Sequence, residues 1–275
     1  MDKLIYIVAT PIGNLEDISA RAIKTLNEVD CILAEDTRRS KILLDHYGIK
    51  TKLISFHKFN EKERLSQIHA TFDEYSKIAL ISDAGTPLIS DPGAYLVEYA
   101  LSQQITLIPI PGPSALTTLL SVSGFSTLSN RVSFLGFLSH TDKAKKDELS
   151  ILLSEDDVFV FFESPKRVLK TIQIIAEIDP NADIVIGREL TKIHEEIIKF
   201  KASCVPNKIM EKGEFTIIVK SSVKKSNKNK LVEQNNNFKS ETKKLAASLA
   251  NYLNIKIKDA YSLLIKLKED SAVGN

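Results

Sequence analysis

Short apolar runs alternate with longer amphipathic stretches from the first residues to about residue 220. Apolar runs bounded by polar turns are typical of buried strands, and apolar positions three or four residues apart are typical of helices. We expect strands over Leu4–Ala9, Ile32–Ala34, Ile78–Ser82, Ile105–Pro109, Val132–Phe137, Val158–Phe162, Ile184–Gly187, Ile197–Phe200 and Phe215–Val219. We expect helices over Ser19–Glu28, Arg39–Tyr47, Glu61–Tyr75, Gly93–Ser102, Pro113–Val122, Lys143–Leu153 and Pro165–Ile178. The alternation predicts an α/β protein whose helices cover both faces of mainly parallel sheets.

The rhythm changes after Glu189, where two short strands follow each other through a turn near His194. We therefore expect antiparallel pairing in this part of the chain. The Pro/Gly cluster at 108–115 is a natural place for the chain to cross from one sheet to another. These signals predict two αβα domains, over residues 1–112 and 113–222.

The composition changes again beyond Val219. Residues 223–240 are rich in Lys, Asn and Ser and have no core-forming pattern, which is typical of a flexible linker. Helical periodicity returns over residues 241–275, where Leu249 and Leu253 belong to one apolar face. We expect a small helix-turn-helix module there. Because so short a pair of helices is marginal alone, it should dock on the body, a partner subunit or RNA.

The formal net charge of +2 hides an uneven distribution. Residues 221–275 hold 11 Lys against 5 acidic side chains, whereas residues 1–220 hold 26 basic and 30 acidic side chains. A basic tail on a mildly acidic body is typical of a segment drawn to phosphate, because neutralising phosphates releases condensed counterions. The other interpretation is a solvated tail that keeps the protein in solution.

The composition also excludes several classes of protein. With 275 residues, 43% apolar and 26% charged, the chain is too rich in core-forming residues to be largely disordered. Its apolar runs are far shorter than the roughly 20 residues of a membrane-crossing helix. Its start lacks the pattern of a secretory signal, so we expect a cytoplasmic protein. Cys31 and Cys204 lie far apart and outside any Cys/His cluster, which excludes a disulfide framework and a zinc site.

Three loops follow predicted strands and precede predicted helices, the position where α/β sheets bind ligands. The first, residues 10–19, has Gly13 as its only glycine and is therefore not a Gly-x-Gly-x-x-Gly loop. The second, residues 82–93, has two glycines that permit close backbone approach and two prolines that stiffen the chain. The third, residues 109–115, brings small residues to a helix start. Each can also be a plain structural turn, with Asp91 as a helix cap in the second loop, and we expect Asp91-Pro92-Gly93 to cap the following helix in either case.

Spacing rules out two catalytic motifs. His194-Glu195-Glu196 starts like the HExxH zinc motif, but Ile198 stands where the second histidine is required. No GxSxG elbow accompanies the five histidines, so hydrolase chemistry has no support.

Taken together, the loops and several other segments resemble a known family. The segments are YIVATPIGNLEDI (6–18), AEDTR (34–38), SDAGTPLISDPG (82–93), PGPSA (111–115), FLGF (134–137), FFESPKR (161–167), RELTKIHEE (188–196) and KGEFTIIV (212–219). In them the chain resembles the tetrapyrrole methylases, the class III S-adenosylmethionine methyltransferases built from two αβα domains. The Pro-Ile-Gly-Asn of the first loop is similar to the branch that methylates small-subunit ribosomal RNA, because tetrapyrrole-modifying relatives have a glycine-rich loop there. The helical tail is similar, less specifically, to the C-terminal helix-turn-helix of that branch.

The resemblance implies transfer of the S-adenosylmethionine methyl group to the 2′-hydroxyl of a cytidine in the decoding region of 16S ribosomal RNA. Such a transfer is accelerated by aligning nucleophile, carbon and sulfur, and a general base helps because a ribose hydroxyl is a poor acid. No metal is implied. The implied cofactor site, between the domains, consists of Pro11, Ser82, Asp83, Ala84, Gly85, Thr86, Leu88, Ile89, Ser114, Ala115 and Phe162.

The candidates for the catalytic site are Glu35, Asp36, Arg38 and Glu163, all next to predicted strand ends. We rank the Glu35–Asp36 pair first because Arg38 beside it can hold a phosphate bidentately. The structural alternative is an ion pair, Asp36 with a neighbouring arginine and Glu163 with Arg167.

The resemblance also implies partners: small-subunit ribosomal RNA or the assembled small subunit, and a second copy of the chain in a homodimer. Apolar residues of the second domain, including the region Phe134–Leu138, are candidates for the dimer contact. No membrane partner is expected. Two other functions stay open, a methyltransferase of the same fold acting on a tetrapyrrole precursor and a non-catalytic ribosome-binding protein.

Overall fold

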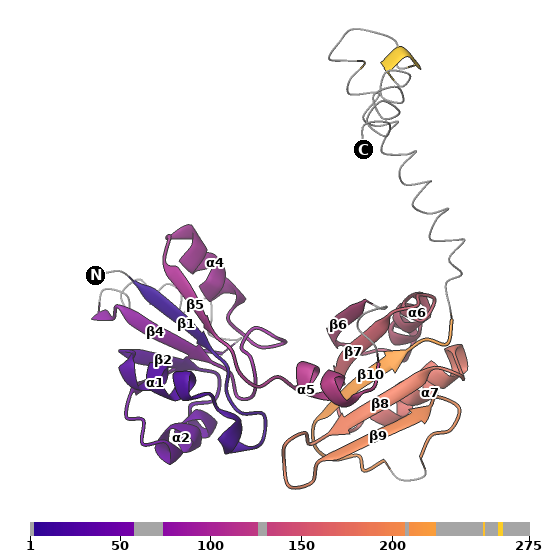
Figure 1. The fold of residues 1–275 in the computed structure, drawn as a ribbon, viewed down its shortest axis with the longest axis horizontal. Coiled ribbons are helices and arrows are strands. Elements are labelled where there is room, and N and C mark those ends of the chain that lie inside the picture. Colours follow the sequence, from indigo (N-terminus) through magenta and orange to yellow (C-terminus); the bar gives the residue numbers. More distant parts are fainter. Residues whose placement is uncertain are drawn as a thin grey trace, which may run out of the picture. The chain divides into compact units, whose positions relative to one another are not determined.

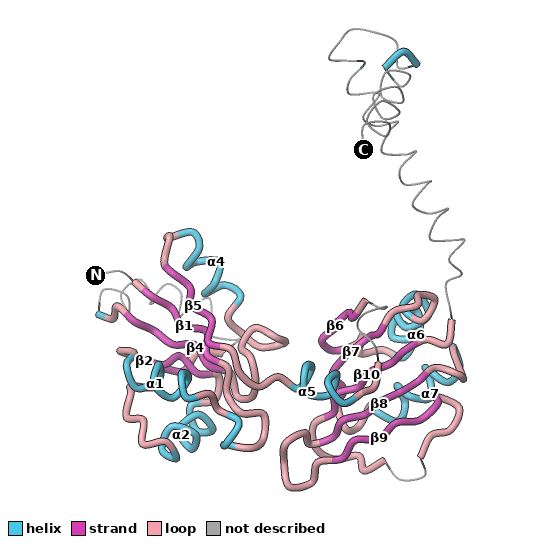
Figure 2. The backbone as a smooth tube through the Cα atoms, in the orientation of Figure 1, coloured by secondary structure: helices cyan, strands magenta, loops and turns pink. Residues whose placement is uncertain are grey.

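The computed structural model describes residues 3–57, 74–125, 131–206 and 209–223, together with Ala250 and residues 258–260. Within these ranges the chain forms two five-stranded sheets with helices packed on them (Figures 1 and 2), which confirms the prediction of an α/β protein. None of the helices in the described ranges is long and apolar enough to cross a membrane.

Residues 1–223 form one compact unit, which contains both sheets, and residues 224–275 form a second unit. The division of the first unit into domains over 1–112 and 113–222 stays a prediction. The predicted linker and the predicted helix-turn-helix lie outside the described residues, apart from Val223, Ala250 and residues 258–260.

The first sheet is entirely parallel, as the alternation predicts, with the order β3-β2-β4-β1-β5. Its strands are β1 (Leu4–Val8), β2 (Cys31–Ala34), β3 (Lys52–Ser55), β4 (Lys77–Ile81) and β5 (Thr106–Ile110). Its helices are α1 (Ala20–Glu28), α2 (Thr37–His46) and α4 (Ala94–Ser102). Successive strand residues point to opposite faces. Val8 and Ile32 therefore pack with α1 and α2, whereas Ile5 and Leu33 pack with α4, so both faces are covered.

Strand β3 is the strand of this sheet that the apolar pattern does not predict. It has four residues, begins with an exposed lysine and lies at the edge of the sheet. An edge strand is half-exposed and needs no continuous apolar run, so the sequence KLIS carries little signal. The helix predicted over Glu61–Tyr75 lies outside the described residues, apart from Glu74 and Tyr75.

The second sheet has the order β6-β7-β10-β8-β9, and here the prediction of mainly parallel pairing is wrong. Its strands are β6 (Val132–Phe137), β7 (Val158–Glu163), β8 (Asp183–Arg188), β9 (Glu196–Lys201) and β10 (Phe215–Lys220). Among the described strand pairs of this second sheet, only β6 with β7 is parallel. The predicted antiparallel pair β8–β9 is confirmed, and β10 runs antiparallel to both β7 and β8. A buried apolar run reads the same in both directions, so the pattern of β10 cannot reveal its orientation.

Helices cover both faces of the second sheet as well. Helices α6 (Asp142–Leu152) and α7 (Val168–Ile178) pack on Phe161, Ile184 and other residues of one face. Helix α5 (Ala115–Val122) packs on the other face, which includes Val160. The chain leaves the first sheet at Ile110 and joins the second through α5, so the Pro/Gly cluster is where it passes between the sheets.

Candidate functional site

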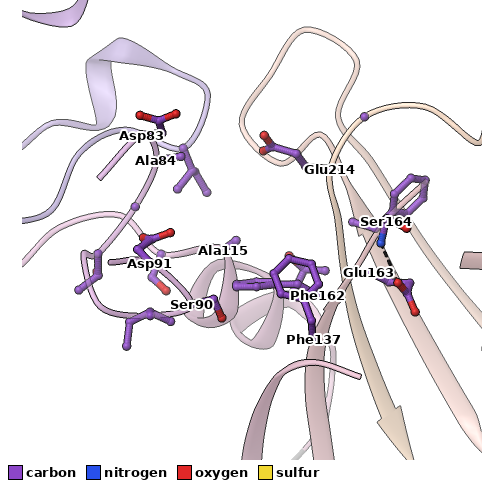
Figure 3. A pocket seen from close by; sticks show the side chains of 18 of the residues that line it. Asp83, Ala84, Ser90, Asp91, Ala115, Phe137, Phe162, Glu163, Ser164 and Glu214 are labelled. Atoms are coloured by element: carbon purple, nitrogen blue, oxygen red, sulfur yellow. Dashed lines mark hydrogen bonds between the residues drawn. The ribbon is translucent and has the colours of Figure 1, made fainter. Parts of the chain in front are cut away.

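A cavity of about 380 Å³ is lined by loops that leave both sheets (Figure 3). The three loops singled out in the sequence are tied together beside it. Thr10 and Gly85 exchange backbone hydrogen bonds of 2.9 and 3.0 Å, and the Thr86 hydroxyl donates to the Pro113 carbonyl at 3.2 Å. The carboxyl ends of β1, β4 and β5 thus meet at one place, which is where parallel sheets bind ligands.

Most of the residues predicted to bind a cofactor line this cavity. They are Asp83, Ala84, Gly85, Thr86, Ile89, Ser114, Ala115 and Phe162. Pro11, Ser82 and Leu88 do not line it. Ser82 is buried below the loop, where its hydroxyl donates to the carbonyls of Ala84 and Gly85 at 3.3 and 3.4 Å. Ser82 therefore supports the loop rather than facing the cavity.

The loop over residues 82–93 has an unusual backbone. Gly85 and Gly93 have φ angles of 81° and 128°, and the non-glycine residues Leu88 and Ser90 have φ angles of 73° and 74°. Such conformations cost about 1–3 kcal/mol each for a residue with a side chain and persist where the surroundings enforce them, often at functional sites. The loop is therefore held in a defined and strained shape at the cavity wall.

The expected cap segment Asp91-Pro92-Gly93 does precede α4, but its last residue and not Asp91 is the N-cap. The N-cap residue is Gly93, which has no side chain that could cap the helix. With its φ of 128°, Gly93 takes the chain into the helix, and its missing Cβ avoids a contact of 2.7 Å with Leu80. Asp91 lines the cavity instead.

Carboxyl groups gather on this side of the cavity. Asp83 accepts a hydrogen bond from the backbone N–H of Asp36 at 3.0 Å and pairs with Arg39 at 3.4 Å. Burial, reinforced by the charges of Glu35 and Asp83, raises the pKa of Asp91 to about 6, although a hydrogen bond with Ser82 opposes the shift. Burial and the charge of Asp83 also raise the pKa of Glu35. These carboxyls are thus close enough to influence each other's protonation.

The other residues of the AEDTR segment lie beside the cavity, not in its wall. Asp36 is the N-cap of α2, and its carboxylate holds the Arg38 guanidinium with bonds of 3.1 and 2.8 Å. The hydrogen bond from the Arg38 side chain lowers the pKa of Asp36 to about 2. Neither of them, nor Glu35, lines the cavity, whereas Arg39 does. The ion pair weighed as the structural alternative is therefore present, and the catalytic role of these residues stays a prediction.

Glu163 lines the cavity, unlike the other three catalytic candidates, and belongs to a buried polar network at its wall. Its carboxylate lies 3.3 Å from the Lys145 ammonium, accepts from the Thr171 hydroxyl at 2.7 Å and pairs with Arg167 at 3.0 Å. The side chains of Lys145 and Glu163 are 1% and 0% exposed. The backbone N–H of Ser164 also donates to this carboxylate (dashed line in Figure 3). The predicted Glu163–Arg167 pair is confirmed, and the network fixes the end of β7, where Phe162, Glu163 and Ser164 line the cavity.

An aromatic cluster forms the opposite wall. The ring centroids of Phe134 and Phe137 lie 5.1 and 5.7 Å from that of Phe162, in edge-to-face geometry. The register of β6 shifts between Phe134 and Phe137, and Gly136 has a φ of 67° there. A Cβ at Gly136 would stand 3.3 Å from the Ser90 hydroxyl, so this glycine lets β6 approach the strained loop.

Several lining residues are not predicted from the sequence, namely Ile12, Arg39, Ser90, Asp91, Phe137, Ser164, Pro165, Gly213, Glu214, Phe215 and Thr216. Most of them lie in or next to segments that carry the family resemblance. A loop has no periodicity, however, so its sequence does not reveal which side chains face inward.

The two walls differ in chemistry. Figure 3 shows Asp83, Ala84, Ser90 and Asp91 on one side and Phe137, Phe162 and Glu214 on the other. Acidic groups favour a cation, aromatic rings offer flat apolar surface, and small residues permit close backbone approach. The cavity is suited to a small, partly flat ligand that carries positive charge.

This fold and site define a class of protein. A profile of the family described as Tetrapyrrole (Corrin/Porphyrin) Methylases matches residues 4–205, and the chain belongs to this family. Its relatives include proteins named ribosomal RNA small subunit methyltransferase I. The one from Thermotoga maritima is 47% identical over 222 residues, which cover 80% of this chain and 98% of that protein. The one from Haemophilus influenzae is 42% identical over 237 residues, which cover 84% of this chain and 83% of that protein.

Solved structures share the fold at low sequence identity. The precorrin-6Y methylase of cobalamin biosynthesis from Archaeoglobus fulgidus superposes with a TM-score of 0.56 at 16% identity, covering 81% of this chain and 100% of that chain. A conserved hypothetical protein from Aeropyrum pernix reaches 0.61 at 12% identity, covering 81% of this chain and 86% of that chain. These similarities concern the fold alone.

Proposed function

We propose that the chain is an S-adenosylmethionine-dependent methyltransferase that 2′-O-methylates the ribose of a cytidine in the decoding region of 16S ribosomal RNA. Family membership supports methyl transfer, and the names of the relatives at 42–47% identity support small-subunit ribosomal RNA as the acceptor. The observation that carries the proposal is the cavity where acidic and small residues face an aromatic wall.

The cavity fits the proposed cofactor in size and chemistry. Its volume of about 380 Å³ falls in the range of small-molecule sites, about 300–1,000 Å³. Asp83 and Glu214 provide negative charge for the ammonium and sulfonium groups, and Phe162 offers a ring face for the adenine. When bound, the sulfonium supplies a methyl group that its positive charge already activates.

The residues of the chain would contribute mainly alignment. Three loops tied to one another and a wall fixed by a buried network can hold the methyl carbon in line with an incoming hydroxyl. Arg39 lies in the wall, and the side chain of Arg38 is 89% exposed next to it. Both guanidinium groups can hold phosphates of the RNA while the ribose enters the cavity.

The remaining proposals concern partners. The acceptor is free ribosomal RNA or the assembled small subunit, the basic tail adds affinity for it, and the enzyme acts as a homodimer in the cytoplasm. In the region proposed for the dimer contact, Leu138 is 1% exposed and Phe137 is 56% exposed. Phe137 is therefore the most exposed residue of this region and the one we propose for the dimer contact.

The test is methyl transfer from isotope-labelled S-adenosylmethionine to three acceptors in parallel, namely small subunits, free 16S RNA and a tetrapyrrole precursor. The proposal predicts label in the RNA of at least one of the first two samples. Label in the tetrapyrrole would reassign the substrate. Binding of small subunits with no label in any sample would indicate a non-catalytic ribosome-binding protein.

A further inference from the structure

A ribose hydroxyl must lose its proton during methyl transfer, so the reaction is helped by a group that can accept that proton inside the cavity. Two of the carboxylates predicted for this role are already engaged. Asp36 holds Arg38, and Glu163 lines the cavity but has a fully buried carboxylate held by Lys145, Thr171 and Arg167. Neither carboxylate is available without breaking these contacts.

We propose, on the basis of the proposed function, that Asp91 is the general base that accepts the 2′-hydroxyl proton of the acceptor ribose. Asp91 lines the cavity and lies on the loop after β4 that the family resemblance places at the cofactor (Figure 3). Its position before α4 would suit a helix cap, yet that role is not used. Its side chain therefore faces the cavity without a structural task at the helix.

The surroundings of Asp91 differ from those of the other acids. Among the described residues Asp91 has no lysine or arginine partner, whereas Asp36, Asp83 and Glu163 each have one. The groups that act on it are Glu35 from the end of β2, Asp83 after β4 and the hydroxyl of Ser82. Arg39 on α2 is 3.4 Å from Asp83 and compensates that carboxylate instead.

These neighbours shift the pKa of Asp91 in the direction that a general base requires. Burial and the negative charges of Glu35 and Asp83 disfavour the ionised form, so the pKa of Asp91 rises to about 6. At pH 7 to 8 the carboxylate is still ionised, but it binds a proton more strongly than an ordinary aspartate. A base whose pKa lies just below the working pH combines availability with proton affinity.

An oxygen lone pair of the 2′-hydroxyl attacks the methyl carbon, and the carbon–sulfur bond breaks with its electron pair going to sulfur. The sulfonium becomes the neutral thioether of S-adenosylhomocysteine. The hydroxyl proton passes to the Asp91 carboxylate and then to solvent. The ribose gains one methyl group and loses one proton.

The test compares Asp91→Asn with Asp83→Asn and with the wild type, using full-length protein and the RNA acceptor that the labelling experiment identifies. Single-turnover methyl transfer is measured from pH 5 to 9, and S-adenosylmethionine binding by calorimetry. Removing a general base typically lowers the rate about 10²- to 10⁴-fold, and we expect that loss for Asp91→Asn with cofactor affinity changed less than about threefold. The rise of the wild-type rate with pH near 6 should be absent in Asp91→Asn and partly restored in Asp91→Glu.

The matched variant Asp83→Asn should keep the rise of rate with pH, because Asp83 is paired with Arg39 and is not the proposed base. It should lose affinity for the cofactor, because it removes a negative charge from the cavity wall. A thermal melt supplies a separate check on folding. Replacing Asp91 removes a charge from beside Glu35 and Asp83, so above pH 6 Asp91→Asn should melt at the same temperature as wild type or higher.

Three outcomes overturn the assignment. They are a rate for Asp91→Asn close to that of wild type, a pH profile that keeps its rise near 6, and loss of cofactor binding, which would place Asp91 among the cofactor ligands. A wild-type protein that binds S-adenosylmethionine but methylates no ribosomal RNA is a different result. It contradicts the proposed function itself, and the role of Asp91 falls with it.

Discussion

Gly85 and Gly48 both have a positive φ, but of the two only Gly85 lines the cavity. Substituting each in turn therefore distinguishes backbone strain from an effect on ligand binding. Gly85 lines the cavity with a φ of 81°, and Gly48 follows α2 with a φ of 66°. A Cβ at Gly85 would stand 3.3 Å from Ile12, whereas a Cβ at Gly48 meets no atom within 4 Å. Because a branched side chain resists positive φ, both Gly85→Val and Gly48→Val should lower the free energy of unfolding, by about 1–2 kcal/mol or more.

Only the Gly85→Val variant should lose cofactor binding, since its side chain also occupies space at the cavity. Calorimetric titration of both folded variants with S-adenosylmethionine checks this prediction. Unchanged affinity in Gly85→Val would place the cofactor elsewhere. An equal loss of affinity in both variants would mean that backbone strain, and not occupied space at the cavity, weakens binding.

Neighbouring lysines on α6 provide a second comparison at this scale. Lys145 is 1% exposed against Glu163, whereas Lys146 is 51% exposed against Glu177. Removing one partner of a buried ion pair costs about 3–5 kcal/mol, and an exposed pair is worth about 0–1 kcal/mol. We expect Lys145→Met to cost about 3 kcal/mol, the lower end of that range, because Arg167 still pairs with Glu163.

Lys146→Met should cost less than about 1 kcal/mol. Denaturant unfolding of the two variants measures the difference. Similar values for both would mean that the Lys145–Glu163 contact contributes little to the stability of the cavity wall.

The positions and roles of individual side chains are predicted least well from the sequence. The loop over residues 82–93, predicted to contact the cofactor, does line the cavity, yet nothing in its sequence separates Asp83, which faces the cavity, from Ser82, which supports the loop. Lys145 on an amphipathic helix has the pattern of a solvated charge, and only the tertiary fold brings it to Glu163. Asp91 fits the composition of a helix cap, but backbone geometry gives that position to Gly93.

Elements are predicted better than side chains because burial imposes a period on the sequence. The strands with apolar runs on covered faces are found within a residue or two, as for β7 and β8. The exposed edge strand β3 is not predicted, and the direction of β10 cannot be predicted from its composition. Strand direction depends on the length of the connections and on tertiary packing, which a local pattern does not encode.

Two helix starts illustrate how an element can serve either stability or the site. Ser19 caps α1, with its hydroxyl accepting from the Ala22 N–H at 3.1 Å. Ser114 stands at the N-cap of α5 but makes no such bond, and it lines the cavity. Loss of an N-cap hydrogen bond costs about 1 kcal/mol. Ser19→Ala should therefore lower the free energy of unfolding by about 1 kcal/mol, and Ser114→Ala by much less.

The order should reverse for ligand binding, where Ser114→Ala weakens S-adenosylmethionine affinity and Ser19→Ala leaves it unchanged. Chemical denaturation and calorimetry on the same two variants give both quantities. A large stability loss in Ser114→Ala would show that its hydroxyl serves the helix after all.

At the scale of the whole molecule, the basic tail should contribute to RNA affinity rather than to cofactor binding. The cut belongs after Val223, because Ser221 donates to the Leu153 carbonyl at 2.6 Å and Ser222 to Asp179 at 2.7 Å. Removing residues 224–275 takes away 11 Lys and 5 acidic side chains, and the described residues that line the cavity all lie before the cut. Affinity for 16S RNA should fall and depend less steeply on salt, because fewer counterions are released.

Titration at several salt concentrations measures that slope, and calorimetry should give unchanged affinity for S-adenosylmethionine. A second variant that replaces the tail lysines with glutamine at full length separates charge from the rest of the segment. Full affinity of the truncated protein at every salt concentration would identify the tail as a solubility device, and loss of cofactor binding would mean that it packs on the body.

The most direct test of the whole account is the chemical identity of the labelled product. Wild type and Gly85→Val are incubated with small subunits and labelled S-adenosylmethionine, and the recovered 16S RNA is digested to nucleosides. The account predicts that the label elutes as 2′-O-methylcytidine with wild type and is absent with Gly85→Val. Label on a base, label on another nucleoside, or equal labelling by the two proteins would contradict it.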